Sequence, residues 1–206
     1  MADPLTFSTE ELSVIQDTRL FKIKADVTPK IQNLLHQLQA VYSEELSRSS
    51  LLMPEGVDTH KGQFVKGEHL LDFPYLYLDF PKLFTTEEKF AFRSLFWWGH
   101  YWVFAWILEG GHMRQYKDNL IGAYDQLSGR GLHLLMTDTP WEWRKDPEFS
   151  LEIRKDNRDQ ITAAIQARPF LKIHRYVDFE NPAFVKGDIA REAAEIFRLM
   201  TVIVAE

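Results

Sequence analysis

The stretch RSLFWWGHYWVFAWILEGG, from Arg93 to Gly111, decides which kind of fold this chain can form. Large apolar side chains fill it from Phe96 to Ile107, interrupted by a glycine, an alanine and His100. A helix that spans a bilayer needs about 20 mostly apolar residues. This stretch is shorter, begins at an arginine and has an imidazole near its centre. Its aromatic and β-branched residues instead predict a central strand over 97–108, covered on both sides.

The composition is that of an ordinary globular chain. Its 206 residues are 45% hydrophobic and 26% charged, which suits one domain over residues 1–206. The formal charge of −6 argues against partners such as nucleic acid or an anionic membrane surface. Cysteine is absent, which excludes disulfides, thiolate metal sites and thiol catalysis. The N-terminal residues lack the basic and then apolar pattern of an export signal, so we expect a cytoplasmic protein.

Helix and strand signals occur in an order typical of an α+β fold. Helices are expected from Ser8, over 29–47 with Thr28-Pro29 as the start, over 86–95 after Thr85, over 116–127, over 156–168 and after Asp188. Strands are expected over 73–81, 97–108, 132–137, 149–153 and 170–179. Strands and helices do not alternate strictly, and no glycine-rich turn links a strand to a helix. We therefore predict a single domain with a mainly antiparallel sheet and helices packed on it.

No sequence motif of a known catalytic or cofactor-binding class is present. The chain lacks G-x-G-x-x-G, the Walker loop, H-E-x-x-H and G-x-S-x-G. Its seven histidines do not pair at metal-ligand spacing, and structural zinc sites need three or four converging ligands. The sequence therefore predicts neither a bound metal nor a cofactor.

The densest polar chemistry lies between residues 60 and 102. The strand over 73–81 would place Tyr75, Tyr77 and Asp79 on one face. Arg93 lies in an apolar segment, where a buried guanidinium needs a carboxylate partner such as Asp79 or Glu68. The alternative is that Arg93 extends its charged end into water.

His100 is the sharpest single candidate for a functional group. In one strand over 97–108 it would share a face with Trp98 and Trp102, and this apolar setting would lower its pKa. A neutral imidazole there suits a general base or a group that orients a ligand. The alternative is a core histidine with a satisfied partner. Trp97 and Trp98 would stack a planar ligand beside a pocket, and otherwise they build core.

These observations define one set of candidate ligand-binding residues. They are Lys66, Glu68, His69, Tyr75, Asp79, Arg93, Trp97, Trp98 and His100.

Two segments resemble a family of uncharacterised bacterial proteins from Bacteroidetes-type genomes. They read K-G-E-H-x-x-x-F-P-Y-x-x-L-D-F-P-K-x-F over 66–84 and F-A-x-R-x-x-F-W-W-G-H over 90–100. Members of that family tend to have Asn where this chain has His69 and His100, and Tyr where it has Phe80. The resemblance implies no activity. Because asparagine does not titrate, it implies a hydrogen-bonding role for His100 rather than proton transfer.

Three functions remain open from the sequence. The first is a protein that binds a small-molecule ligand or a protein partner in a cleft lined by the candidate residues. The second is an acid–base enzyme of hydrolase or lyase type, with Glu68 or Asp79 paired to His69 or His100. The third is an assembly protein that forms a homodimer through Trp141 and Trp143, because two tryptophans in a polar loop are costly to expose.

Overall fold

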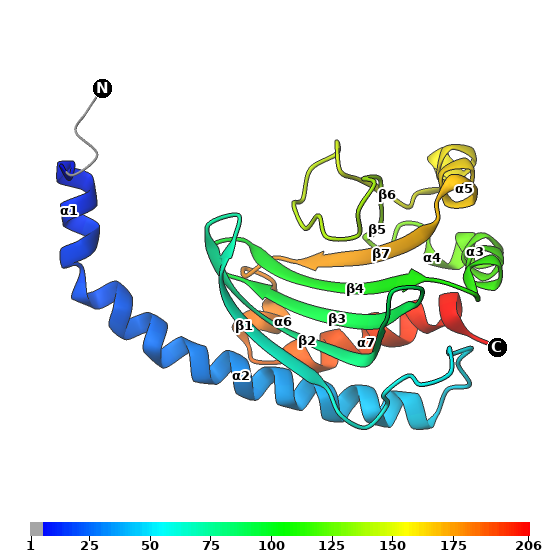
Figure 1. Cartoon of the computed structure of the whole chain (residues 1–206), viewed down its shortest axis with the longest axis horizontal. Coiled ribbons are helices and arrows are strands. Elements are labelled where there is room, and N and C mark those ends of the chain that lie inside the picture. The colour runs from blue at the N-terminus through cyan, green and yellow to red at the C-terminus, as the bar shows by residue number, and fades with distance from the viewer. Residues whose placement is uncertain (1–5) are drawn as a thin grey trace.

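Strands β3 (Lys89–Trp97) and β4 (Tyr101–Glu109) form the central hairpin of the structure, a computed structural model that describes residues 6–206 (Figure 1). Between Lys89 and Glu109, every residue within these two strands is buried. Central strands covered on both faces read as continuous apolar runs, which is why this stretch does not alternate between apolar and polar residues. The expected α+β fold with an antiparallel sheet is confirmed.

The sheet has seven antiparallel strands in the order β1-β2-β3-β4-β7-β5-β6. The other strands are β1 (Gln63–Leu70), β2 (Phe73–Phe84), β5 (Leu132–Leu135), β6 (Ser150–Glu152) and β7 (Phe170–Val177). The helices are α1 (Thr9–Gln16), α2 (Thr18–Ser47), α3 (Met113–Gly122), α4 (Tyr124–Leu127), α5 (Arg158–Ala167), α6 (Pro182–Val185) and α7 (Ile189–Thr201). None of them, in the part of the chain described, is long and apolar enough to cross a membrane.

The two sides of the sheet are covered differently. Helices α2, α3, α5 and α7 lie against one side, the helix face, and form with it the larger apolar core (Figure 1). That core takes the even-numbered side chains of β3 and β4, including Phe92 and Trp106. The odd-numbered side chains point to the other side, where residues 136–149, the cover loop, lie over the centre. We call this side the loop face.

The expected strand over 97–108 is wrong, because a tight turn interrupts it. Trp97 pairs with Tyr101 across the hairpin, and residues 98–100 form the turn. Gly99 has a φ of +74°, a left-handed conformation that glycine adopts without steric penalty. His100 therefore lies in a turn and shares no strand face with Trp102.

The expected helix over 86–95 is also wrong. The Thr85 hydroxyl accepts the backbone N–H groups of Glu87 and Glu88, as a helix cap would. The Thr85 N–H, however, donates to the Glu88 carbonyl and closes the turn between β2 and β3. A Ser or Thr hydroxyl makes the same local bonds in a turn and at a helix start, so the aromatic residues that follow decide for a strand.

Thr28-Pro29 does not begin a helix, since Pro29 lies inside α2. The helix begins at Thr18, where the Asp17 carboxylate accepts the first free N–H groups. Proline removes the donor for the carbonyl four residues earlier, on Ala25, and Ala25 is exposed to water. The capping box expected at Ser8 is confirmed. Strand β1 was missed, because its burial does not follow a clean alternation.

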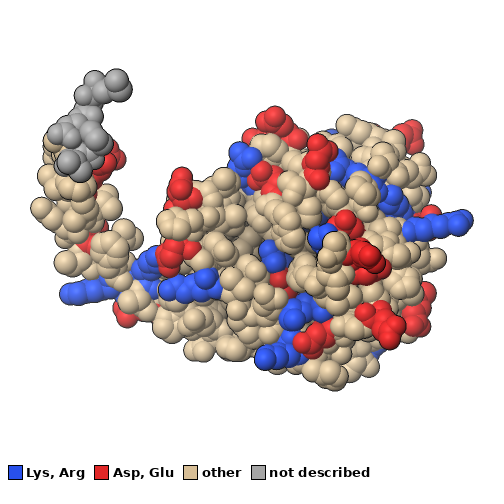
Figure 2. Space-filling view, viewed as in Figure 1, with Lys and Arg blue, Asp and Glu red and all other residues tan. Residues whose placement is uncertain are grey.

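Helix α1 and the first turns of α2 project from the body of the molecule (Figure 2). No side chain of α1 is buried, whereas α2 buries five between Ile31 and Glu45. We call residues 7–23 the arm. At its base, Lys24 forms an ion pair of 2.6 Å with Glu68 on β1.

Candidate functional site

A row of polar residues crosses the loop face of the sheet. The strand registers place Asp79 opposite Arg93, Arg93 opposite Ala105, and Ala105 opposite His174. His174 is in turn opposite His133, and His133 is opposite Glu152 on the edge strand. Directly opposed side chains in antiparallel strands project to the same face. The sheet therefore aligns five ionisable groups, the polar row, which are Asp79, Arg93, His174, His133 and Glu152.

Asp79 and Arg93 form a buried bidentate ion pair. Nε and Nη2 of Arg93 each donate to one carboxylate oxygen at 2.7 Å. Burial raises the pKa of the Asp79 carboxyl, and the two hydrogen bonds from Arg93 oppose that rise. The guanidinium also lies 3.8 Å from the centre of the Tyr77 ring. Both charges of the pair thus find their partner within the fold, which marks it as a structural pair.

The middle of the row is occupied by the cover loop. Ala105 leaves space above the sheet, and Trp143 packs into the same apolar cluster as Ala105. On one side of the Trp143 ring lies Lys172, whose Nζ is 3.2 Å from the ring centre, and on the other lies Arg93 at 5.4 Å. Burial, with Arg93 nearby, lowers the pKa of Lys172 well below its usual value.

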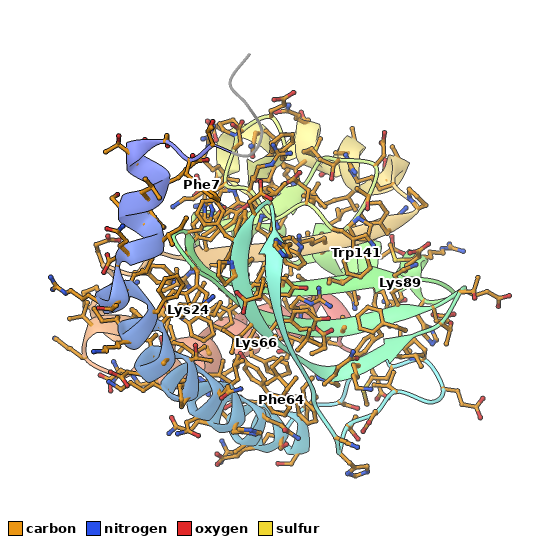
Figure 3. All side chains as sticks on the ribbon, turned by 60° about the vertical axis from the view of Figure 1, so that its left-hand side comes forward. Phe7, Lys24, Phe64, Lys66, Lys89 and Trp141 are labelled. Atoms are coloured by element: carbon orange, nitrogen blue, oxygen red, sulfur yellow. The ribbon has the colours of Figure 1, made fainter. Side chains whose placement is uncertain are left out.

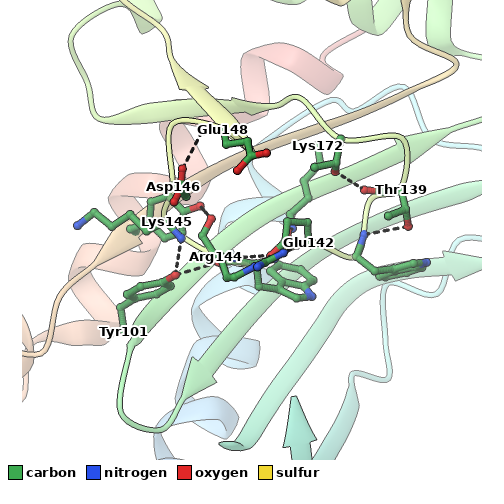
Figure 4. A network of polar contacts seen from close by, with 12 residues as sticks. Tyr101, Thr139, Glu142, Arg144, Lys145, Asp146, Glu148 and Lys172 are labelled. Atoms are coloured by element: carbon green, nitrogen blue, oxygen red, sulfur yellow. Dashed lines mark hydrogen bonds and ion pairs between the residues drawn. The ribbon is translucent and has the colours of Figure 1, made fainter. Parts of the chain in front are cut away.

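Side chains of the sheet hold the cover loop by its backbone (Figure 4). Lys172 donates to the carbonyl of Glu142, Tyr101 to that of Trp143, and Tyr176 to that of Arg144. The Tyr101 hydroxyl also accepts the backbone N–H of Lys145 at 2.7 Å. A segment without regular secondary structure thereby gains partners for its buried polar groups.

The hydrogen bonds of Tyr176 fix the tautomer of His174. The Tyr176 hydroxyl is 2.9 Å from the Arg144 carbonyl and 2.9 Å from Nε2 of His174. A carbonyl only accepts, so the single hydroxyl proton goes to Arg144 and Nε2–H of His174 must donate. Nδ1 of His174 is then unprotonated and buried. Burial lowers the pKa of His174 well below its usual value, so the ring is neutral.

A pocket of about 460 Å³ opens at the edge end of the polar row. His133 lines it together with Lys145, Ser150, Glu152, Asn157 and Gln160. The His133 ring stacks near His174, with ring centres 5.7 Å apart and planes 20° apart. Its Nδ1 is buried without a hydrogen bond to any described residue, and burial lowers its pKa. The pocket is thus lined by a neutral imidazole that makes no hydrogen bond to a described residue.

Charges around this pocket are unequally compensated. Lys145 pairs with Asp178 at 3.0 Å, and Arg154 with Asp156 at 3.0 Å. The Glu152 side chain has no ion pair or hydrogen bond within residues 6–206. Asp146 also lines the pocket, and among the described residues its carboxylate accepts only the backbone N–H of Glu148. Within the described chain, the pocket therefore has two acids without an ion pair, and Glu152 is the one beside His133.

The structure brings together four of the nine residues predicted as a site. Tyr75, Asp79, Arg93 and Trp97 all project to the loop face. Of the two carboxylates left open as partners of Arg93, the structure pairs it with Asp79 and not with Glu68. Trp97 is fully buried and donates its indole N–H to the carbonyl of Leu70, so it serves the core. Trp98 packs on the helix face instead, edge-on to Phe96.

The other predicted residues lie at the sheet margin. His100 stacks on Trp97 at 3.7 Å between ring centres, and burial lowers its pKa, as the sequence predicted. Lys66, Glu68 and His69 are exposed on edge strand β1, where Glu68 pairs with Lys24 and with Lys66 at 3.5 Å. Neither His69 nor His100 hydrogen bonds to a carboxylate in the described structure.

Three residues of the site were not predicted. They are His133, His174 and Lys172, and only the last two carried a partial signal, because the alternation over 170–179 places them on one face. That pattern does not say what covers the face, and the cover loop buries both at 1% exposure. Trp143, expected with Trp141 on an exposed surface, is likewise buried, and only Trp141 is exposed. No group of three or more metal-binding side chains is found among the described residues.

Comparisons with protein-family models, with curated proteins and with solved structures gave no match. The family resemblance of residues 66–100 therefore stays a prediction, and the geometry alone supports a functional proposal.

Proposed function

We propose that the protein binds a small polar ligand that carries an amine, in the pocket between His133 and Glu152. The observation that carries this proposal is the free Glu152 carboxylate opposite a neutral, half-buried imidazole in a pocket of about 460 Å³. Small-molecule sites usually have volumes of about 300–1,000 Å³ and a few convergent polar groups.

The charge balance favours an amine over an anion. The two nearby cations, Lys145 and Arg154, are already paired with aspartates, whereas Glu152 is unpaired. An ammonium group would donate a charge-assisted hydrogen bond to Glu152. Nδ1 of His133 is buried, so Nε2 is the ring nitrogen that a ligand would reach, and without a proton it would accept a second hydrogen bond. Behind the pocket, the hydrogen bond between Tyr176 and His174 fixes the His174 ring, and this ring would keep the His133 imidazole in place.

Ligand binding is favoured over acid–base catalysis by the state of the carboxylates. The proposed catalytic pairs needed Glu68 or Asp79 within hydrogen-bond reach of His69 or His100. Asp79 is instead bonded to Arg93, and Glu68 to Lys24. Neither carboxylate is thus available as the partner of an imidazole.

A thermal-shift screen would test the proposal. Amino alcohols, polyamines and amino sugars would be compared with carboxylates of similar size that lack an amine. A ligand present at 100 times its Kd stabilises the folded state by about 2.7 kcal/mol, which is measurable as a raised Tm. We expect amines to raise Tm and the carboxylates to leave it unchanged.

Two variants sharpen the screen. Glu152→Gln should remove the shift caused by amines, because it removes the free charge beside His133. Asp159→Asn, which changes an exposed acid on α5 by the same chemistry, should leave the shift intact. Equal shifts with amines and carboxylates, or a full shift in Glu152→Gln, would contradict the proposal.

A further inference from the structure

The arm carries more exposed apolar surface than any other segment of the described chain. Seven of the thirteen exposed large hydrophobic residues lie on it: Phe7, Leu12, Val14, Ile15, Leu20, Phe21 and Ile23. Large apolar patches on a protein surface usually mark an interaction site. An isolated helix as short as α1 is also marginal in water, so tertiary contacts would be needed to keep it folded.

The apolar stripe of the arm continues the stripe that packs onto the domain. Within α2, Ile31 and Leu35 are buried against the sheet and Val27 is half-buried. Leu20 and Ile23 extend the same helical spacing beyond the domain, yet they are 49% and 46% exposed. The apolar face of α2 thus packs on the domain in its C-terminal part and is exposed to water in its first turns.

The same chain has a second uncovered apolar surface, the aromatic stripe of the loop face. It consists of Phe73, Tyr75, Tyr77 and Phe84 on β2 together with Trp141 of the cover loop. The neighbouring edge strand β1 does not cover the stripe at Tyr75, because the residue opposite, Gly67, has no side chain. The Tyr75 ring lies against Gly67 instead. Figure 3 shows Trp141 apart from the base of the arm at Lys24.

The arm leaves this stripe uncovered within one chain. All arm side chains are exposed, and its ion pair with β1 is formed at the base, by Lys24. We propose that the chain forms a two-fold dimer in which the arm of each copy lies across the aromatic stripe of the other. Each copy supplies one donor surface and one acceptor surface, so the exchange closes at two chains.

The area is sufficient for a stable dimer. With large side chains burying about 150–250 Å² each, the seven arm residues at 42–64% exposure present on the order of 600 Å². Two arms and two stripes would together bury roughly 2,000 Å², which lies in the range of stable interfaces.

The charges of the arm favour a second copy over a membrane surface. Helices that bind anionic bilayers are rich in Lys and Arg on their polar face. On the arm, the acids Glu10, Glu11 and Asp17 outnumber the bases Arg19 and Lys22. The arm thus has no excess of positive charge, and its apolar stripe is the feature left for a partner to recognise.

Light scattering after size-exclusion chromatography would test the dimer. The full chain should have twice the monomer mass, and Leu20→Ser/Ile23→Ser should have the monomer mass with an unchanged circular dichroism signal from the sheet. Val185→Ser is the matched control, because Val185 is 70% exposed on α6, which belongs to neither surface. A monomeric wild type at all concentrations, or a dimeric double variant, would overturn the proposal.

Cross-linking would test which surfaces meet. The chain has no cysteine, so each engineered thiol is unique. A mixture of Ile15→Cys and Phe84→Cys chains treated with a short bismaleimide should give a linked heterodimer, whereas Ile15→Cys with Val185→Cys should not. Linkage of Ile15→Cys to itself alone would indicate arm-on-arm pairing and contradict the exchange.

Flotation of the wild type, but not the double variant, with phosphatidylglycerol vesicles would assign the arm to membranes instead. None of these outcomes depends on ligand binding at Glu152.

Discussion

Nζ of Lys172 lies 3.2 Å from the centre of the Trp143 ring and donates to the carbonyl of Glu142. This contact joins the sheet to the cover loop above the middle of the polar row. Because burial lowers the pKa of Lys172, the contact is carried by the hydrogen bond and by packing of the side chain on the indole ring. Lys172 and Trp143 therefore hold the loop as one unit, and the stability of the loop should depend on both.

Replacement of Lys172 by methionine should loosen the cover loop without unfolding the sheet. Methionine keeps the apolar stem but loses the donor to Glu142, a hydrogen bond contributing about 1 kcal/mol. Backbone amide exchange over 140–146 should accelerate several-fold, while exchange in β3 and β4 stays slow. Lys186→Met, on the exposed end of α6, should change neither. Unchanged exchange in the loop of Lys172→Met would contradict this role.

The two tryptophans of the cover loop should differ strongly in their effect on stability. Trp143 is 4% exposed and Trp141 is 41% exposed. Trp143→Ala should lower the free energy of unfolding by about 3–5 kcal/mol, because it leaves a cavity over Ala105. Trp141→Ala should lower it by less than about 1 kcal/mol. Urea unfolding measures both stability losses, at a protein concentration low enough that a dimer does not contribute. Equal losses in the two variants would contradict the burial of Trp143.

The Asp79–Arg93 pair should show strong coupling in a double-mutant cycle. Arg93→Met alone leaves a buried carboxylate without its partner, which typically costs about 3–5 kcal/mol. Asp79→Leu/Arg93→Met should be more stable than either single variant, because it removes both charges. The exposed pair Arg158–Asp125 provides the comparison, with a coupling below about 1 kcal/mol. Additive effects at Asp79 and Arg93 would refute the buried pair.

Stability should fall as the pH drops below about 6.5, the ordinary pKa of histidine. Burial lowers the pKa of His133 and of His174 in the folded state, so the unfolded chain binds more protons in this range. Each ring can then remove up to about 1.4 kcal/mol per pH unit between its unfolded and folded pKa values. His174→Gln should weaken this dependence and exposed His69→Gln should not. Unfolding by urea at several pH values is the measurement, and a slope unchanged in His174→Gln would contradict the expectation.

Two glycine-to-alanine substitutions should change the stability of the protein in opposite directions. A Cβ on Gly67 would lie 2.3–2.4 Å from atoms of the Tyr75 ring, so Gly67→Ala should displace that ring and cost about 1–3 kcal/mol. A Cβ on Gly122, in α3, would meet no atom within 4 Å, and Gly122→Ala should stabilise the helix by about 0.5–1 kcal/mol. Thermal unfolding compares the two, and a neutral Gly67→Ala would show that Tyr75 does not lie over β1.

Much of the local structure could be predicted because its causes are local. The capping box at Ser8 depends on residues three positions apart, and the faces of β2 and β7 follow from period-two alternation. Arg93 required a carboxylate by its burial alone, and Asp79 is that carboxylate. The failure at Thr85 has the opposite cause, since the same local bonds serve a turn as well as a helix. At Pro29 the helix continues through the proline, because the Ala25 carbonyl that loses its donor is exposed to water.

The amino-acid sequence by itself determined the α+β class and the buried central segment, because both follow from the apolar content and the periodicity of neighbouring residues. Tertiary structure alone decided that His133 lies beside His174 and Glu152, since these residues come from three strands whose neighbours are set by sheet order and register. It also decided that the cover loop buries Lys172 and Trp143. The physical reason is that alternation assigns a side chain to a face but carries no information about which distant segment covers that face.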